Sequence, residues 1–163
     1  MSEPALFERL FRWDAWANER VVGVLRACGA SAPGSGARKA TDRLAHLLCA
    51  QEVWLSRLGL GEWPEGRTIF PESSSVEGLA RDAALLAARW AQVCRVLDAR
   101  LLDEVISYTS TSGAPYDTAR RDILLHVTHH GAYHRGQIAV DLKRDGVICP
   151  PTDYVAFART ASM

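Results

Sequence analysis

Apolar residues recur at every third or fourth position along four long segments of this chain, and this spacing constrains the fold more than any other feature. The segments run from about Pro4 to Cys28, Thr41 to Leu58, Ser75 to Leu102 and Asp117 to Arg144. Such a period places the apolar side chains on one face of an α-helix, and that face is buried against other helices. The pattern therefore predicts an all-α protein, a four-helix bundle.

Local residue types predict where these helices begin and what connects them. Pro4 suits a first helical turn, Thr41 is the expected N-cap of the second helix, and Ser74 or Ser75 is that of the third. Before the last long helix, β-branched and aromatic residues from Ile106 to Tyr116 favour a short extended or hairpin connection.

Two further segments are expected to lie outside the long helices. Ala30 to Gly36 contains proline and glycine and should form a loop, whereas Val147 to Met163 has two prolines and then a short apolar patch that predicts a short helix. No repeat and no low-complexity segment divides the chain, so residues 1–163 are expected to form a single domain.

Composition and charge exclude several classes of function. Acidic and basic residues are equal at 19 each, and there is no basic stripe or helix-turn-helix signature, so we expect no nucleic-acid partner. No run approaches 18 apolar residues and the first ten residues lack a signal peptide, which predicts no membrane association and a cytoplasmic location. The four cysteines form no C-x-x-C pair, which argues against a zinc ribbon or a disulfide framework.

Four of the five histidines lie within one stretch of the last predicted helix: His126, His129, His130 and His134. Positions spaced by four lie one turn apart on the same helix face, so two such imidazoles can bind one metal ion. His46 lies in the second predicted helix. Imidazoles from two helices would form a three-ligand site with an open position, as catalytic metal sites have. A cluster hydrogen-bonded to water or a carboxylate fits the spacing equally well.

Two glycines interrupt the same predicted helix. Gly131 and Gly136 each cost about 1 kcal/mol of helix stability relative to alanine. They predict a close approach of another backbone or of a ligand, although tight packing between helices explains them as well.

Three segments carry a resemblance to a known family. The first is Trp13-Asp-Ala-Trp-Ala-Asn18, the second begins at His46 and ends in Trp54-Leu-Ser-Arg-Leu58, and the third is H-x3-H-x3-H-R-G-Q from His126 to Gln137. They resemble the DinB family of four-helix proteins, which are described as DinB/YfiT-like metalloenzymes. The resemblance spans nearly the whole chain, and its third segment is the most specific.

The resemblance implies that His46, His130 and His134 bind a divalent transition metal, with Zn, Ni or Fe as the expected ion. It places His126 beside these ligands, where it would support them without binding the metal. His129 stands where relatives often have asparagine, and we expect it at the surface.

Two residues after the last histidine are further candidates for the site. Arg135 could neutralise a carboxylate of a cofactor or substrate, or could be a structural cation on the helix surface. Gln137 could orient a ligand or hydrogen-bond a histidine, or could form a hydrogen bond between helices.

The resemblance also implies an activity. Characterised relatives in the wider superfamily include transferases and isomerases that depend on low-molecular-weight thiols such as bacillithiol or mycothiol. We therefore expect metal-activated transfer of a thiol to a small electrophile, in a stress or detoxification role, and a homodimer by analogy.

Two alternatives remain open. A metal-dependent hydrolase would need a general base, and the nearby candidates Glu52 and Asp141 are poorly placed on ideal helices. The second alternative is a non-catalytic metal-binding protein with a stress or assembly role.

Overall fold

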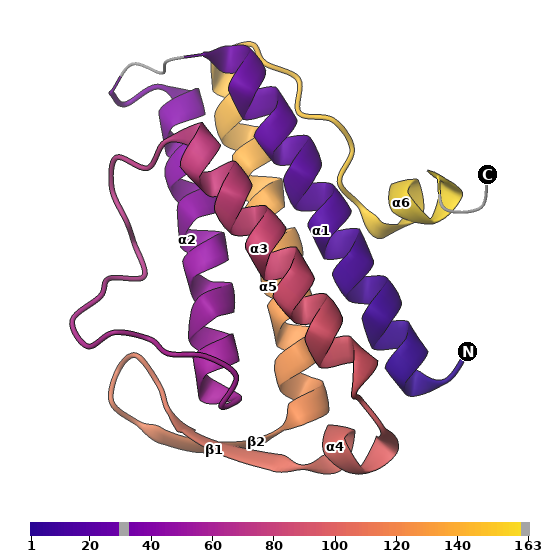
Figure 1. Cartoon of the computed structure of the whole chain (residues 1–163). Helices are drawn as coiled ribbons and strands as arrows, with labels where there is room; N and C mark the ends of the chain where they lie inside the picture. Colours follow the sequence, from indigo (N-terminus) through magenta and orange to yellow (C-terminus); the bar gives the residue numbers. More distant parts are fainter. Residues whose placement is uncertain (30–32, 161–163) are drawn as a thin grey trace.

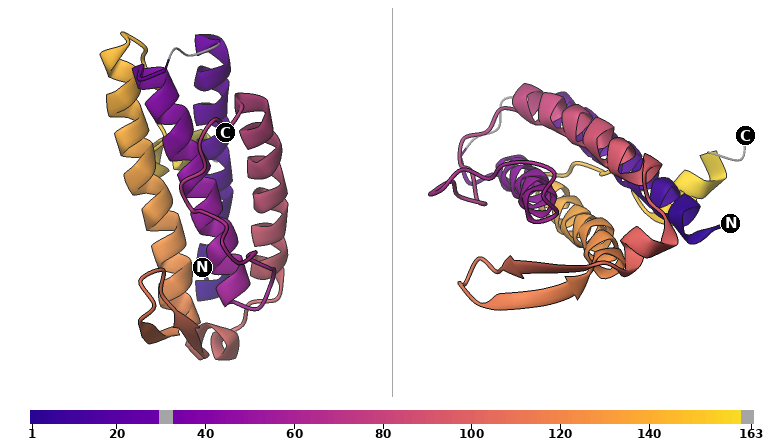
Figure 2. Two further views of the ribbon diagram at one scale, coloured as in Figure 1. Left: turned by 90° about the vertical axis from the view of Figure 1, so that its left-hand side faces the viewer. Right: turned by 60° about the horizontal axis from the view of Figure 1, so that its bottom comes forward.

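Four long helices form a bundle in the computed structural model of this protein, which describes residues 1–29 and 33–160 (Figure 1). They are α1 (Glu3–Cys28), α2 (Gly36–Arg57), α3 (Val76–Arg95) and α5 (Arg120–Arg144). The helices pack mainly as two pairs, α1 against α3 and α2 against α5 (Figure 2). Their apolar faces meet in one large buried core that draws residues from each long helix, such as Phe7, Leu44, Trp90 and Leu124. The predicted all-α bundle is confirmed.

Short elements complete the bundle at its ends and along one side. The helix α4 (Ala99–Asp103) is followed by an antiparallel hairpin of β1 (Val105–Thr109) and β2 (Pro115–Ala119), which lies across one end of the bundle (Figure 1). The predicted connection before the last long helix is therefore a hairpin. The short helix expected in the tail is α6 (Tyr154–Thr160), which packs against α1.

The second helix begins earlier than the sequence predicts, and Thr41 is not its N-cap. The hydroxyl of Ser35 caps the first turn by accepting a backbone N–H, and the carboxylate of Asp145 accepts the N–H groups of Gly36 and Ala37 at 2.9 and 2.7 Å. The first N–H groups of a helix have no partner within the helix. Here a carboxylate from the far end of α5 accepts two of them, and the residues near the start of α2 give no indication of this contact. Residues 30–32 of the predicted loop lie outside the described residues.

Two other helix boundaries also differ from those predicted. The third helix ends at Arg95 because Asp98 caps a separate helix, its carboxylate accepting the N–H of Leu101 at 2.7 Å. The last long helix begins at Arg120 and not at Asp117, since residues 117–119 pair with β1. In both places the apolar periodicity extends beyond the helix, and a helix cap or a strand pairing sets the actual boundary.

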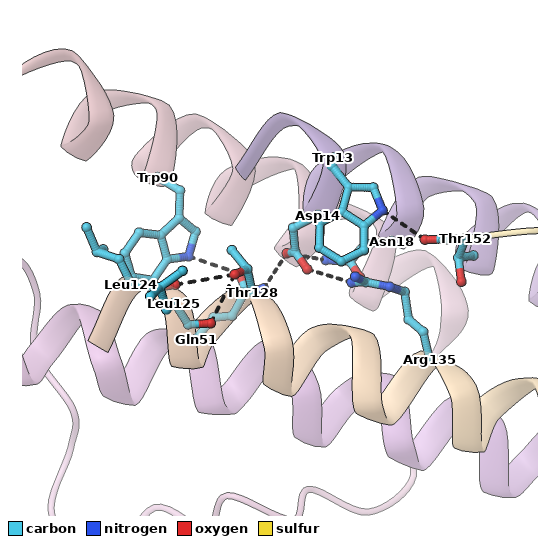
Figure 3. A network of polar contacts seen from close by, with 10 residues as sticks. All are labelled: Trp13, Asp14, Asn18, Gln51, Trp90, Leu124, Leu125, Thr128, Arg135 and Thr152. Atoms are coloured by element: carbon cyan, nitrogen blue, oxygen red, sulfur yellow. Dashed lines mark hydrogen bonds and ion pairs between the residues drawn. The ribbon is translucent and has the colours of Figure 1, made fainter. Parts of the chain in front are cut away.

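A network of buried polar side chains connects all four long helices (Figure 3). On α5, Arg135 donates from Nη1 to Asp14 at 2.5 Å and to Asn18 at 2.9 Å, both on α1. Gln51 on α2 donates to the other oxygen of Asp14 at 2.7 Å and accepts the indole N–H of Trp90 on α3 at 3.0 Å. Each of these residues is at most 3% exposed, so the network lies inside the core.

The two glycines of α5 have different surroundings. A Cβ atom at Gly131 would lie 2.5 Å from Oδ1 of Asp14 and 3.0 Å from Nη1 of Arg135, whereas a Cβ at Gly136 would meet nothing within 4 Å. The close neighbour at Gly131 is a buried side chain, which fits the alternative of tight packing between helices, whereas no described atom of the protein approaches Gly136 in this way.

None of the helices in the described part of the chain combines the length and hydropathy that a membrane crossing requires. The single domain, the cytoplasmic location and the homodimer expected from the sequence stay predictions.

The contrast between the two glycines gives a stability prediction. Gly131→Ala should lower the free energy of unfolding by about 1–3 kcal/mol, because the new methyl group overpacks the Asp14–Arg135 pair. Gly136→Ala is the matched control on the same helix and should raise stability by up to about 1 kcal/mol, since alanine favours the helix. Urea unfolding followed by circular dichroism measures both. Equal effects at the two positions would contradict this account of the packing.

Candidate metal centre

Three histidines from two helices converge at the contact between α2 and α5. His130 and His134 lie one turn apart on α5, and His46 faces them from α2. One ring nitrogen from each of the three falls within 4.8 Å of the others. The Nε2 atoms of His130 and His134 are 3.0 Å apart. The family resemblance implied these three residues as metal ligands, and the structure brings them together.

Two of the three imidazoles are held through their Nδ1 atoms. His46 has Nδ1 2.8 Å from the carbonyl oxygen of Ile69, which can only accept, so this nitrogen carries the hydrogen. The ring of His46 also stacks on Phe70, with centroids 4.4 Å apart. His134 has Nδ1 3.0 Å from Oε1 of Gln137. Contacts of this kind leave Nε2 as the free ligand nitrogen and fix the ring orientation.

The surroundings of the cluster keep two of its histidines, His130 and His134, neutral. Burial, followed by the proximity of His134, His126 and His46, lowers the pKa of His130 from 6.5 to about 4. Burial also lowers the pKa of His134, with a further contribution from His46. At pH 7 these rings therefore present unprotonated nitrogens, the form that binds metals.

The geometry fits a transition metal ion. Two nitrogens bound to one tetrahedral zinc ion lie about 3.3 Å apart, which follows from Zn–N bonds of about 2.0–2.1 Å. The separation of the His130 and His134 nitrogens is close to this value, and the nitrogen of His46 lies within 4.8 Å of them. The donor set is neutral imidazole, which suits Zn, Ni and Fe better than the oxygen-preferring Mg and Ca.

His126 and His129 lie outside the cluster of ligand nitrogens. The ring of His126 is 5.5 Å from that of His130 and contacts Trp54 edge-on at 5.2 Å, so it adjoins the cluster as expected. Burial lowers its pKa too, with help from Arg57. His129 is exposed, as predicted, and its Nδ1 lies 2.7 Å from the carbonyl of Leu125.

Arg135 occupies neither of the positions that the sequence suggested. Its side chain is 1% exposed and its guanidinium binds Asp14 and Asn18 inside the bundle, where it also lies 5.1 Å from the ring of Trp13 (Figure 3). It is therefore neither a surface cation nor free to meet a ligand carboxylate. The sequence missed this role because its partners are more than a hundred residues away.

The remaining polar candidates are held by ion pairs or hydrogen bonds. Gln137 bonds a histidine, as one of its predicted roles required, and also accepts from Arg43 at 2.9 Å. Asp141 has a side chain that is 2% exposed and paired with both Arg43 and Arg144. Glu52 pairs with Arg67 at 2.6 Å. Neither carboxylate is free to act as a base beside the cluster.

A pocket of about 300 Å³ opens beside the histidines. Its lining residues are Asp42, Arg43, His46, Phe70, Pro71, Glu72 and His134. This volume is at the lower end for small-molecule sites. A larger cavity of about 850 Å³ lies between α1 and α3, but none of the five histidines lines it. The smaller pocket is therefore the one in which a small molecule would lie beside the histidines.

Sequence reasoning missed three contributors to this site. Arg43 lies one helical turn before His46, and that spacing could have identified it as a neighbour of the cluster. Ile69 and Phe70 come from the long loop between α2 and α3, whose sequence has no periodicity that could predict their approach to His46.

Comparisons with known proteins agree with these features. The sequence model of the DinB family matches residues 1–162. The chain is also similar to Protein DinB of Bacillus subtilis (strain 168), with 24% identity over 158 residues that cover 90% of each chain. No solved structure matches the chain significantly. Because the family match spans almost every residue, this chain belongs to the DinB family.

Proposed function

We propose that this protein binds one divalent transition metal ion, Zn, Ni or Fe, through His46, His130 and His134 and uses it to activate a low-molecular-weight thiol. The thiol would then be transferred to a small electrophile. The observation that carries the proposal is the convergence of three imidazoles beside an accessible pocket. Three protein ligands leave one coordination position for a substrate.

A divalent ion held there would lower the pKa of a thiol or a water molecule in the open position. The chain itself supplies the orientation of the ligands, through the Ile69 carbonyl behind His46 and the Gln137 amide behind His134. Phe70 and Pro71 give the pocket an apolar wall, which excludes water from one side of it. These residues therefore orient the histidines and determine the shape of the pocket beside them.

Ionisation favours a thiol over water as the nucleophile. A thiol ionises near pH 8.5 unaided, whereas water needs far more help, including a general base. The carboxylates that the sequence suggested as bases, Asp141 and Glu52, are both held in ion pairs with arginine. Two other carboxylates line the pocket, and Asp42 is paired with Arg38. Hydrolysis would therefore depend on Glu72 as its base, whereas thiol transfer needs no base.

The metal site is tested first by composition. Purified wild-type protein should contain about one equivalent of a transition metal, and His134→Ala should lose most of it because only two imidazoles remain. The control is His129→Ala, which removes an exposed histidine of the same helix and should retain the metal. Elemental mass spectrometry gives both numbers. Wild-type protein that stays metal-free after reconstitution would refute the site.

Thiol transfer is tested on the metal-loaded protein. Bacillithiol, mycothiol, glutathione and cysteine are each offered with an aryl halide, and the consumption of thiol is followed. Activity should appear with at least one thiol, disappear with a chelator and return with metal. If the metal is bound tightly but no thiol is consumed, and its removal only lowers the melting temperature, the protein is a non-catalytic metal-binding protein.

Protons compete with the metal for the same nitrogens, which gives a stability prediction. The pKa of His130 is about 4 in the folded protein and about 6.5 when unfolded, so between these values the unfolded chain binds more protons. The metal-free protein should therefore lose stability as the pH falls from about 6.5 toward 4.

Urea unfolding at several pH values measures this loss, with His130→Asn as the comparison. The difference between wild type and this variant isolates the histidine from the acidic residues that also titrate below pH 5. A bound metal should not remove this dependence, because the unfolded chain still takes up protons that metal-bound histidines cannot take up. An identical pH dependence in wild type and variant would contradict the lowered pKa.

A further inference from the structure

A series of hydrogen bonds runs from α2 to the Nδ1 atom of His134. Gln137 Oε1 lies 3.0 Å from this nitrogen and accepts Nη1 of Arg43 at 2.9 Å. Arg43 in turn donates from Nε to Asp141 at 2.5 Å. Arg43 lies outside the three sequence segments that carry the family resemblance, and it is the arginine that lines the pocket of the histidine cluster.

The chemistry of these groups fixes their orientation. A guanidinium can only donate hydrogen bonds, so the atom of Gln137 that faces Arg43 has to be the amide oxygen and not the NH₂ group. The same oxygen faces His134, so Nδ1 of that ring has to carry its hydrogen. Nε2 of His134 is then left with its lone pair, and it is the nitrogen that points to His130 at 3.0 Å.

Arg43 is itself held in place from behind. Asp141 receives Arg43 on one carboxylate oxygen and Arg144 on the other, at 2.5 and 2.9 Å, and its side chain is 2% exposed. A buried carboxylate between two cations restrains the guanidinium far better than a solvated pair would. The two arginines thus share one partner, but only Arg43 reaches Gln137.

We propose that Arg43 is a positioning residue: it fixes the amide of Gln137 and, through it, the tautomer of His134 that presents Nε2 to a metal. Without Arg43 the amide is free to turn and donate its NH₂ group to Nδ1, which would leave the hydrogen on Nε2 and block that ligand. The effect on metal binding rests on the proposed function. The effect on the tautomer does not, since it concerns the metal-free protein.

The experiment compares Arg43→Met with Arg144→Met. Both variants remove one cation from Asp141, but only the first removes the donor to Gln137. Long-range ¹H–¹⁵N spectra of the metal-free protein at pH 8 report which nitrogen of His134 is protonated. Wild type and Arg144→Met should show hydrogen on Nδ1, and Arg43→Met should show a mixture of tautomers. The double variant Arg43→Met/Gln137→Glu should restore the wild-type pattern, because a carboxylate can only accept.

Calorimetric titration with Zn²⁺ gives the second readout. The dissociation constant should rise about 10–100-fold in Arg43→Met and stay within about threefold in Arg144→Met. Gln137→Met keeps the Arg43–Asp141 pair and should reproduce the effect of Arg43→Met, which covers the case in which that variant does not fold.

The outcomes separate the two proposals. An unchanged tautomer in both Arg43→Met and Gln137→Met, or equal changes in Arg43→Met and Arg144→Met, would overturn the role of Arg43. Wild-type protein with the expected tautomer but no affinity for Zn²⁺ would uphold the orienting role and refute the metal site.

Discussion

The buried ion pair between Asp14 and Arg135 is the interaction on which the rest of the structure depends. Removing one partner of such a pair typically costs about 3–5 kcal/mol, because the other charge is left without compensation in the core. Here both side chains are at most 4% exposed, and hydrogen bonds through Gln51 connect the pair to Trp90 on α3. A shift of α5 by one residue would unpair Arg135, so other helix registers are strongly disfavoured.

This buried network also determines where the histidines meet. Arg135 directly follows His134 on α5, and Gln51 lies five residues after His46 on α2. Because Arg135 and Gln51 bind the same carboxylate, that of Asp14, the position of α5 along the axis of α2 is fixed, and with it the position of the histidines on the two helices. Gly131 permits this by leaving room for Asp14, whose oxygen takes the space of a side chain. The histidine cluster and the core therefore depend on the same pairing of α2 with α5.

The sequence predicted what depends on spacing along one helix and missed what depends on contacts across the bundle. The periodic apolar segments indicated the bundle, and the spacing of His130 and His134, together with the family resemblance, indicated the cluster. The predicted start of α2 was wrong because Ser35 is its N-cap and the distant Asp145 accepts its first N–H groups, and Arg135 was misplaced because its partner is on α1. Such partners leave no trace in a local pattern.

The cluster disfavours protons for the same reason that it suits a metal. Burial and mutual proximity make it costly for His130 and His134 to carry positive charge, as their lowered pKa values show. A single divalent ion bound by the three rings would be stabilised by their nitrogen lone pairs, whereas separate protons would place like charges side by side. Two nearby cations, Arg43 and Arg144, share the single carboxylate of Asp141, and Arg43 further lowers the pKa of His134. Because the partners at Nδ1 are the uncharged oxygens of Ile69 and Gln137, they orient the rings of His46 and His134 without occupying Nε2.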